Sequence, residues 1–225
     1  MEYNGPKTKK RKNITFDITL TEEQKLAKAI ILDKTITTIR GQAGSGKSLV
    51  ACQVGLDMLF NKEVDKFIIA RPAVTAQEDL GYLPGGVSEK LELFIKPIMD
   101  NFKTLYSRST NGYNKWSKIE TLMRDEDIEI VSIGHLRGRT FNNAFVLIDE
   151  AQNTTVAQME MILTRLGKQS KMVITGDLAQ TDIKAESGLA RLIDIVPKIE
   201  RLEDVVLTDN HRADIVGDIL KYYNR

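Results

Sequence analysis

The stretch GQAGSGKS decides the fold of this chain, and it comprises Gly41, Gln42, Ala43, Gly44, Ser45, Gly46, Lys47 and Ser48. It fits the pattern G-x-x-x-x-G-K-[ST] of a phosphate-binding loop, the Walker A motif. The motif has this meaning only when a strand enters the loop and a helix leaves it. Residues 35–39 (TITTI) are β-branched throughout, and residues 48–60 have helical length with an apolar face. We therefore predict a strand, a glycine loop and a helix in that order.

The loop has the chemistry of a phosphate site. Its glycines allow backbone N–H groups to turn toward phosphate oxygens at the positive end of the following helix. Lys47 is predicted to reach the β- and γ-phosphates, and the Ser48 hydroxyl to ligate Mg²⁺. Leu49, the next residue, is predicted to contact the nucleotide as well. The alternative is a glycine-rich turn followed by a chance Lys-Ser pair, and the rest of the sequence has to decide between the two.

Composition indicates one globular domain. The chain has 225 residues, of which 42% are hydrophobic, and this is enough for one substantial core. Lys and Arg number 32 against 31 Asp and Glu, so the net charge of +1 gives no general sign of nucleic-acid binding. The single cysteine, Cys52, lies on an apolar helix face, and packing explains it better than chemistry. Since neither a membrane span nor a signal peptide is visible, we expect a cytoplasmic protein without a membrane partner.

Charge and hydropathy divide the chain in two. Residues 1–13 are polar with a basic run at 7–12, which predicts a flexible tail. An arm that contacts nucleic-acid phosphates is the alternative for this tail. In residues 14–225 helices alternate with near-continuous apolar strands, expected at 35–39, 66–70, 128–133, 144–148, 171–175 and 203–207. This alternation predicts a single α/β domain whose mostly parallel sheet is covered by helices on both faces. The polar residues 107–118 are predicted to form a mobile loop or an insertion between strands.

A second motif follows the strand expected at 144–148. The apolar run FVLI ends in Asp149 and Glu150, the Walker B pattern, which places carboxylates at the carboxyl edge of the sheet, where ligands bind. Asp149 is predicted to hold the metal that bridges the phosphates. Glu150 is predicted to polarise a water for in-line attack on the γ-phosphate. The two motifs together predict a nucleoside triphosphatase.

Three further blocks follow in order along the chain. They are Asp149-Glu150-Ala151-Gln152, Gly176-Asp177-x-x-Gln180 and Asp209-Asn210-His211-Arg212. The series resembles the first RecA-like domain of superfamily-one helicases. The resemblance implies that ATP is the nucleotide, that Gln180 senses the γ-phosphate and that Arg212 contacts it from the same domain.

Gln24 has two possible roles. It stands where those helicases use a glutamine to read adenine, and a side-chain amide can pair with an adenine edge. It also lies three residues after Thr21, as in a capping box at the start of a helix. The two roles are compatible.

The chain is still more similar to the PhoH family of ATPases. The family's signature blocks are matched in order by Arg71-Pro72-Ala73-Val74, 80–85 (LGYLPG), Arg137-Gly138-Arg139-Thr140, 149–155 (DEAQNTT), 163–165 (LTR) and 187–189 (SGL). The chain departs from the family at Leu136, where Met is usual, and at 209–213 (DNHRA), but Arg212 aligns in both patterns. This short form is similar to versions encoded by bacteriophages. The resemblance therefore implies that the protein is located in the cytoplasm of a bacterium or of a phage-infected host.

The resemblance leaves two functions open. One is a motor or remodeller of RNA or single-stranded DNA, whose backbone would contact Arg71, Thr75, Arg137, Arg139 and Thr140. The other is an ATP-dependent oligomeric switch that acts on a protein partner. An ion pair with an acidic side chain is the alternative explanation for each arginine.

We also expect assembly. Two-domain helicases complete the site with an arginine from a second core, and 225 residues hold one core. A neighbouring copy would then supply the arginine, which predicts a homo-oligomeric ring, a hexamer by analogy with RecA-like ring ATPases. The candidates for the donated residue are Arg71, Arg137, Arg139 and Arg165.

Overall fold

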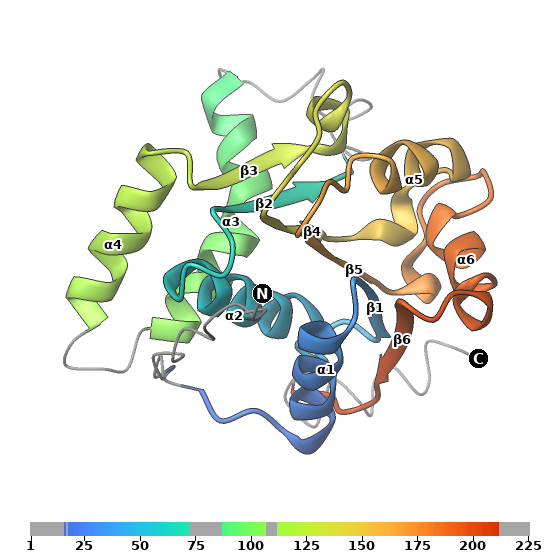
Figure 1. Ribbon diagram of the computed structural model, residues 1–225, viewed down its shortest axis with the longest axis horizontal. Helices are drawn as coiled ribbons and strands as arrows, with labels where there is room; N and C mark the ends of the chain where they lie inside the picture. The colour runs from blue at the N-terminus through green and yellow to red at the C-terminus, as the bar shows by residue number, and fades with distance from the viewer. Residues whose placement is uncertain (1–15, 17, 73–86, 107–111, 212–225) are drawn as a thin grey trace, which may run out of the picture.

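A single parallel sheet forms the centre of the protein. The computed structural model describes residues 16, 18–72, 87–106 and 112–211, with only the backbone described at 87–94 and 112–115. Its six strands are β1 (Ile36–Gly41), β2 (Lys66–Arg71), β3 (Ile128–Ser132), β4 (Ala144–Ile148), β5 (Lys171–Gly176) and β6 (Leu202–Leu207). They lie in the order β3-β2-β4-β5-β1-β6, and every neighbouring pair is parallel (Figure 1). The predicted α/β class with a parallel sheet is confirmed.

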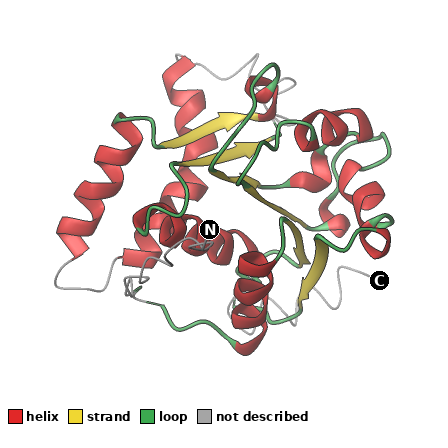
Figure 2. Ribbon diagram, in the orientation of Figure 1, coloured by secondary structure: helices red, strands yellow, loops and turns green. Residues whose placement is uncertain are grey.

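Helices cover both faces of this sheet (Figures 1 and 2). The six described α-helices are α1 (Glu22–Asp33), α2 (Lys47–Phe60), α3 (Val87–Tyr106), α4 (Gly112–Arg124), α5 (Val156–Leu163) and α6 (Gly188–Ile193). The first four share one core with Phe67, Ile69 and other side chains of that sheet face. The last two share a second core with Ile68 and Ala70 on the opposite face. Successive residues of β2 thus enter different cores, which explains why the strand is apolar throughout.

The segment 107–118, predicted as a mobile loop or an insertion between strands, contains the start of a helix. Helix α4 begins at Gly112, inside that segment, and continues to Arg124. Its Ile119 is fully buried, and Trp116, Leu122 and Met123 pack against the same core. These positions repeat at helical spacing, but polar residues between them lower the local hydropathy. Only part of the interval is therefore a connection.

Other expected elements differ little from the structure. Helix α3 continues through Pro97, although proline supplies no backbone N–H for the helix. The tail at 1–13 lies outside the described residues, as do Thr75 and Arg212. Among the helices that the structure describes, none is long and apolar enough to cross a membrane.

The strand order brings the motifs together. Strand β5 lies between β1, which enters the glycine loop, and β4, which ends at the carboxylates. Because all six strands are parallel, the carboxyl ends of β1, β2, β4 and β5 meet at one edge of the sheet. That edge holds the candidate site.

Candidate active site

The glycine loop has the predicted strand-loop-helix context, since it joins β1 to α2. Gly46 is the N-cap residue of α2 and has left-handed backbone angles, with φ 84° and ψ 16°. The left-handed φ favours glycine, and a Cβ at this position would displace the Gln24 side-chain nitrogen, which lies 2.5 Å from it. The Lys47 ammonium folds back over the loop and donates to the carbonyl oxygens of Gly41 at 2.6 Å and Gln42 at 2.9 Å.

Asp149 connects the two motifs. Its Oδ1 accepts hydrogen bonds from the Ser48 hydroxyl at 2.6 Å and from the Thr175 hydroxyl at 2.7 Å. The residue is only 4% exposed. Thr175 belongs to β5, so the strand between the two motif strands holds the carboxylate in place. Sequence reasoning gave no role to Thr175, whose position depends on the strand order.

The donor set at Asp149 fits Mg²⁺. A hydroxyl and a carboxylate supply the hard oxygen ligands that this ion prefers, and phosphates and water usually complete its shell. Among the described residues there is no group of three or more His, Cys, Asp or Glu side chains suited to a metal. Ser48 and Asp149 would therefore hold the ion together with a bound nucleotide.

Glu150 is held in an unusual backbone conformation. It precedes the 3₁₀ turn at Ala151–Asn153 and has left-handed angles, φ 58° and ψ 37°. Its Oε2 accepts a hydrogen bond from the Gln152 amide at 2.8 Å. The side-chain oxygen Oε1 of Gln152 in turn accepts from the Asp177 backbone N–H at 3.1 Å. Gln152 is buried and thus orients Glu150, a role that its place beside the carboxylates in the DEAQ stretch could have suggested.

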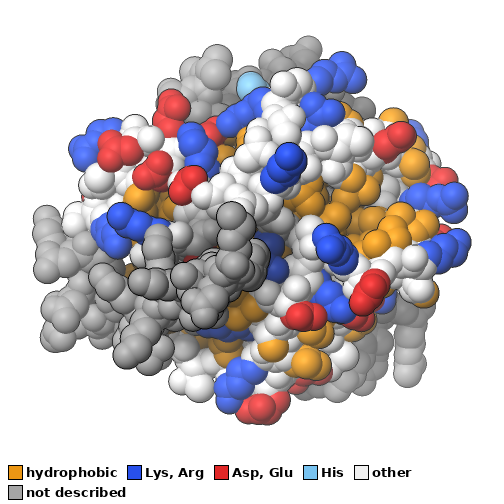
Figure 3. Space-filling model, in the orientation of Figure 1, with side chains coloured by type: hydrophobic (Ala, Val, Ile, Leu, Met, Phe, Trp, Pro, Cys, Tyr) orange, Lys and Arg blue, Asp and Glu red, His pale blue; other side chains and the backbone are white. Residues whose placement is uncertain are grey.

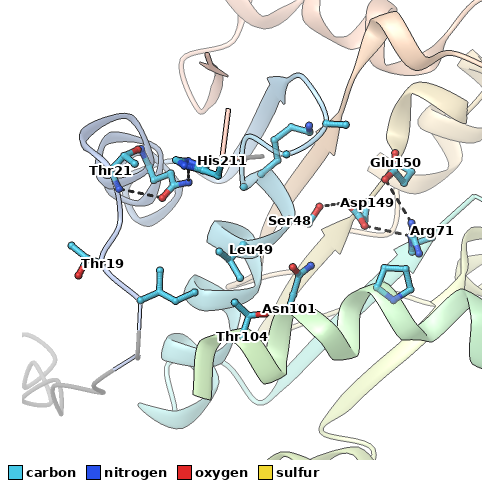
Figure 4. A pocket seen from close by; sticks show the side chains of 17 residues that line it. Thr19, Thr21, Ser48, Leu49, Arg71, Asn101, Thr104, Asp149, Glu150 and His211 are labelled. Carbon is cyan, nitrogen blue, oxygen red and sulfur yellow. Dashed lines mark hydrogen bonds and ion pairs between the residues drawn. The ribbon is translucent and has the colours of Figure 1, made fainter. Parts of the chain in front are cut away.

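Arg71 faces the same two carboxylates, as Figure 4 shows. Its Nε lies 3.4 Å from Asp149 Oδ2, and its Nη2 lies 3.6 Å from Glu150 Oε1. The side chain is 15% exposed. It was predicted as a contact to nucleic acid or as an arginine donated to a neighbouring copy. The guanidinium is turned into its own site here, and both roles stay predictions.

A cavity of about 660 Å³ lies over these groups, a size typical of small-molecule sites. The glycine loop, Asp149, Glu150 and Arg71 line one part of it. The remaining walls come from the segment before α1, from His211, and from Pro97, Asn101 and Thr104 on α3 (Figure 4). Sequence reasoning did not identify the α3 wall, because it lies in an interval without a recognised motif.

Gln24 belongs to this cavity and to a helix cap at once. The predicted capping box is confirmed, since Thr21 accepts from the Gln24 backbone and Gln24 Oε1 accepts from the Thr21 backbone. The Gln24 amide nitrogen lies 3.2 Å from the Ser45 carbonyl oxygen and 3.0 Å from His211 Nε2. The amide is buried and has partners within the chain on both ends. Its contact with adenine stays a prediction.

Comparison with known proteins identifies the family. The family model described as PhoH-like protein matches residues 18–224. This chain belongs to the PhoH family. Similar relatives are the PhoH-like protein of Synechocystis, 41% identical over 84% of this chain and 57% of the relative, and Protein PhoH of Escherichia coli K12, 36% identical over 84% and 52%. The chain thus spans about half the length of the curated relatives it matches.

Solved structures show weaker similarity. The Pif1 helicase from Candida albicans has a TM-score of 0.48 and 16% identity, covering 91% of this chain and 43% of that chain. The UvsW helicase from bacteriophage T4 has a TM-score of 0.49 and 14% identity, covering 84% and 60%. Similarity at this level carries no argument about function.

The PhoH block at 137–140 lies apart from the cavity. Arg139 donates to both carboxylate oxygens of Glu129, at 3.0 and 2.8 Å, and its guanidinium lies 4.8 Å from the centre of the Phe141 ring. Arg139 and Thr140 line a smaller cavity with Lys66 and Ala144, the first residues of β2 and β4. That is the opposite edge of the sheet from Arg71. Arg71 and Arg139 thus lie at different edges of the sheet, and Arg137 is exposed; the nucleic-acid contacts stay a prediction.

Gln180 also lies outside the cavity lining. Its side chain is exposed and donates to Asp177 Oδ2 at 2.8 Å. Its predicted role at the γ-phosphate would require a rotation away from Asp177, and it stays a prediction.

Proposed function

We propose that this PhoH protein binds ATP with Mg²⁺ and hydrolyses its γ-phosphate. The observation that carries the proposal is the 2.6 Å contact between the Ser48 hydroxyl and Asp149 Oδ1. The two residues are 101 positions apart in the chain, yet they meet beside a cavity of nucleotide size. This is the pairing that a Walker A hydroxyl and a Walker B carboxylate make around Mg²⁺ in phosphate-transferring sites.

Each residue has a distinct part in the proposed reaction. Lys47 exchanges its carbonyl partners for the β- and γ-phosphates. Bound Mg²⁺ would neutralise charge on the phosphate oxygens. Glu150, oriented by Gln152, polarises the attacking water and accepts its proton. Gln180 and Arg212 contact the γ-phosphate, as the family resemblance implies.

Phosphate release is the direct test. The protein is incubated with ATP in Mg²⁺ and in EDTA, next to its Glu150→Gln variant. We expect phosphate release by the parent in Mg²⁺ only, and nearly none by the variant. Equal release by both proteins would point to a contaminant or to another site and would overturn the proposal.

We further propose that hydrolysis is coupled to RNA or single-stranded DNA. The support is the family resemblance together with the exposed Arg137 and Thr140. On the face shown in Figure 3, however, Lys and Arg side chains are interspersed with Asp and Glu. A labelled oligonucleotide should bind in a salt-dependent manner and stimulate hydrolysis. Neither binding nor stimulation at low salt would contradict this coupling.

One observation favours the alternative, an ATP-dependent oligomeric switch that acts on a protein partner. Two of the expected phosphate contacts already face carboxylates of the chain, Arg71 at Asp149 and Arg139 at Glu129. A switch would change its assembly state with ATP and remain indifferent to oligonucleotides. Light scattering with and without the nucleotide therefore distinguishes the two functions.

We propose a homo-oligomeric ring, a hexamer by analogy, with ATP between subunits. Of the candidate arginines, Arg71 faces its own site, Arg139 pairs with Glu129, and Arg165 donates to Met161 and Arg139 carbonyl oxygens. The exposed Arg137 is therefore the best-supported group for donation to a neighbour. Mixing Glu150→Gln and Arg137→Ala proteins should restore part of the activity that each lacks. An active monomer would contradict the ring.

A further inference from the structure

Arg71 is positioned by the backbone of the sheet itself. It is the last residue of β2, and Ala70 is in register with Ile148 of β4. The ladder continues one step further, because the Asp149 backbone N–H donates to the Ala70 carbonyl oxygen at 2.9 Å. Arg71 and Asp149 therefore leave two adjacent strands at the same level. This register makes the contact a consequence of the fold.

The oxygens of the two carboxylates are divided in a regular way. At Asp149, Oδ1 accepts from two hydroxyls, and Oδ2 faces the Arg71 guanidinium. At Glu150, Oε2 accepts from the Gln152 amide, and Oε1 faces the same guanidinium. Neutral donors thus hold one oxygen of each carboxylate. The other oxygen of each carboxylate faces the single positive charge of the Arg71 guanidinium.

The contact between the Arg71 guanidinium and the two carboxylates is loose enough for a metal ion to replace it. The two N···O distances are 3.4 and 3.6 Å, whereas tight charge-assisted hydrogen bonds measure about 2.7–2.9 Å. Two neighbouring carboxylates repel the polyphosphate of an incoming nucleotide, and this repulsion increases as the effective dielectric constant of the site falls. The guanidinium offsets part of it before a metal ion arrives.

We propose that Arg71 is a built-in counter-ion, which offsets part of the negative charge of Asp149 and Glu150 and so allows ATP to bind before Mg²⁺ supplies that compensation. The inference rests on the proposed function and assigns Arg71 as a positioning residue. It predicts that Arg71 matters most for nucleotide binding without metal. With Mg²⁺ present, the ion supplies the compensating charge at Ser48 and Asp149, and the contribution of Arg71 becomes smaller.

The test compares nucleotide affinity with and without the metal. The Kd of the β,γ-imido analogue of ATP is measured by titration calorimetry in EDTA and in Mg²⁺ for four proteins: the parent, Arg71→Ala, Arg71→Lys and Arg191→Ala. The exposed Arg191 on α6 lies outside the cavity lining and serves as the matched control. The measured quantity is the ratio of the Kd in EDTA to the Kd in Mg²⁺.

We expect this ratio to rise about tenfold in Arg71→Ala. A tenfold change corresponds to a loss of about 1.4 kcal/mol of binding free energy with the charge. Arg71→Lys keeps the charge and should stay within about twofold of the parent, as should Arg191→Ala. An unchanged ratio in Arg71→Ala would overturn the inference. If both affinities were weaker by the same factor, the cause would be a fold defect. A Lys variant that shifts as far as the Ala variant would also overturn it, because charge would then not be the cause.

Two further outcomes are distinguishable. If the parent fails to bind the analogue in Mg²⁺, the proposed ATPase function itself is wrong. If Arg71→Ala does not fold, as judged by thermal unfolding, Arg71→Lys and Arg71→Gln decide the question. The Gln variant retains hydrogen bonding without charge and should show the raised ratio, and an unchanged ratio would overturn the inference.

Discussion

The Gln24 amide nitrogen lies 3.2 Å from the Ser45 carbonyl oxygen, so helix α1 is hydrogen-bonded to the phosphate loop. His211, which follows β6, contacts the same amide and donates its backbone N–H to the Gly44 carbonyl at 3.1 Å. Two segments from distant parts of the chain thus hold the loop from outside. The loop is shaped before any nucleotide binds.

This arrangement gives the Gln24→Ala variant two separable effects. We expect the variant to lose about 1 kcal/mol of folding free energy with the cap, and also to bind ATP more weakly because the loop loses its bond at Ser45. Gln158→Ala is the matched control, since it breaks the equivalent capping box of Thr155 on α5, away from the cavity. Denaturant unfolding and titration with ATP and GTP give both quantities. Equal ATP affinity in the two variants would leave Gln24 with a capping role alone, and an unchanged ATP:GTP ratio would speak against adenine reading.

Lys47→Ala should abolish tight ATP binding and leave the fold intact. The side chain donates to two carbonyl oxygens of its own loop, and its charge is the main attraction for the phosphates. We expect at least about a hundredfold loss of affinity by calorimetry. Lys184→Ala, an exposed lysine outside the cavity lining, is the control. Unchanged affinity in the Lys47 variant would refute the site.

Glu150→Gln should separate binding from turnover. ATP still binds, because Asp149 and Ser48 remain for Mg²⁺, but hydrolysis falls by about a hundredfold or more without the proton acceptor. Gln152→Ala should give a smaller loss of kcat with little change in KM, since it releases Glu150 from its orientation and removes an acceptor from the Asp177 backbone N–H, but leaves the metal and phosphate ligands in place. Parent-like turnover in the Glu150 variant would remove this residue from the mechanism.

We expect Glu23 to make a contribution to folding stability that is lost in acid. Its carboxylate accepts hydrogen bonds from the Thr208 hydroxyl and from the Thr208 and Asp209 backbone N–H groups, and these bonds lower the pKa of Glu23 from its ordinary value of 4.5. A lowered pKa stabilises the fold above about 4.5, and this stabilisation is lost as the pH falls through the lower folded value. The Tm difference between the parent and Glu23→Gln should therefore be largest near neutral pH and shrink in acid. A difference that is constant with pH would contradict this linkage.

Cys52 should resist thiol reagents in the folded protein. Burial raises the pKa of the Cys52 thiol well above its ordinary value, so the reactive thiolate is scarce and inaccessible at pH 8. Labelling should require opening of α2, and bound ATP should slow it further because the nucleotide holds the start of that helix. Labelling as fast as in denaturant would show that α2 is not stably packed.

The two motifs and the sheet class were predictable, because both depend on short stretches of sequence. Which side chains contact the two carboxylates was not predictable from the sequence. Whether Arg71 faces Asp149 depends on β2 lying beside β4, and no local pattern encodes that pairing. The same holds for Thr175 on β5. Helix α4 was missed for a different reason, since its buried positions are spaced among polar residues that dominate the average.

The left-handed backbone of Glu150 has a consequence for engineering. Such a conformation costs a residue with a side chain on the order of 1 kcal/mol, and glycine adopts it freely. Replacing Glu150 with glycine would therefore tend to stabilise the fold while it removes the proposed proton acceptor. Selection of variants for thermal stability alone would favour this loss, so a screen on this scaffold has to score turnover together with melting temperature.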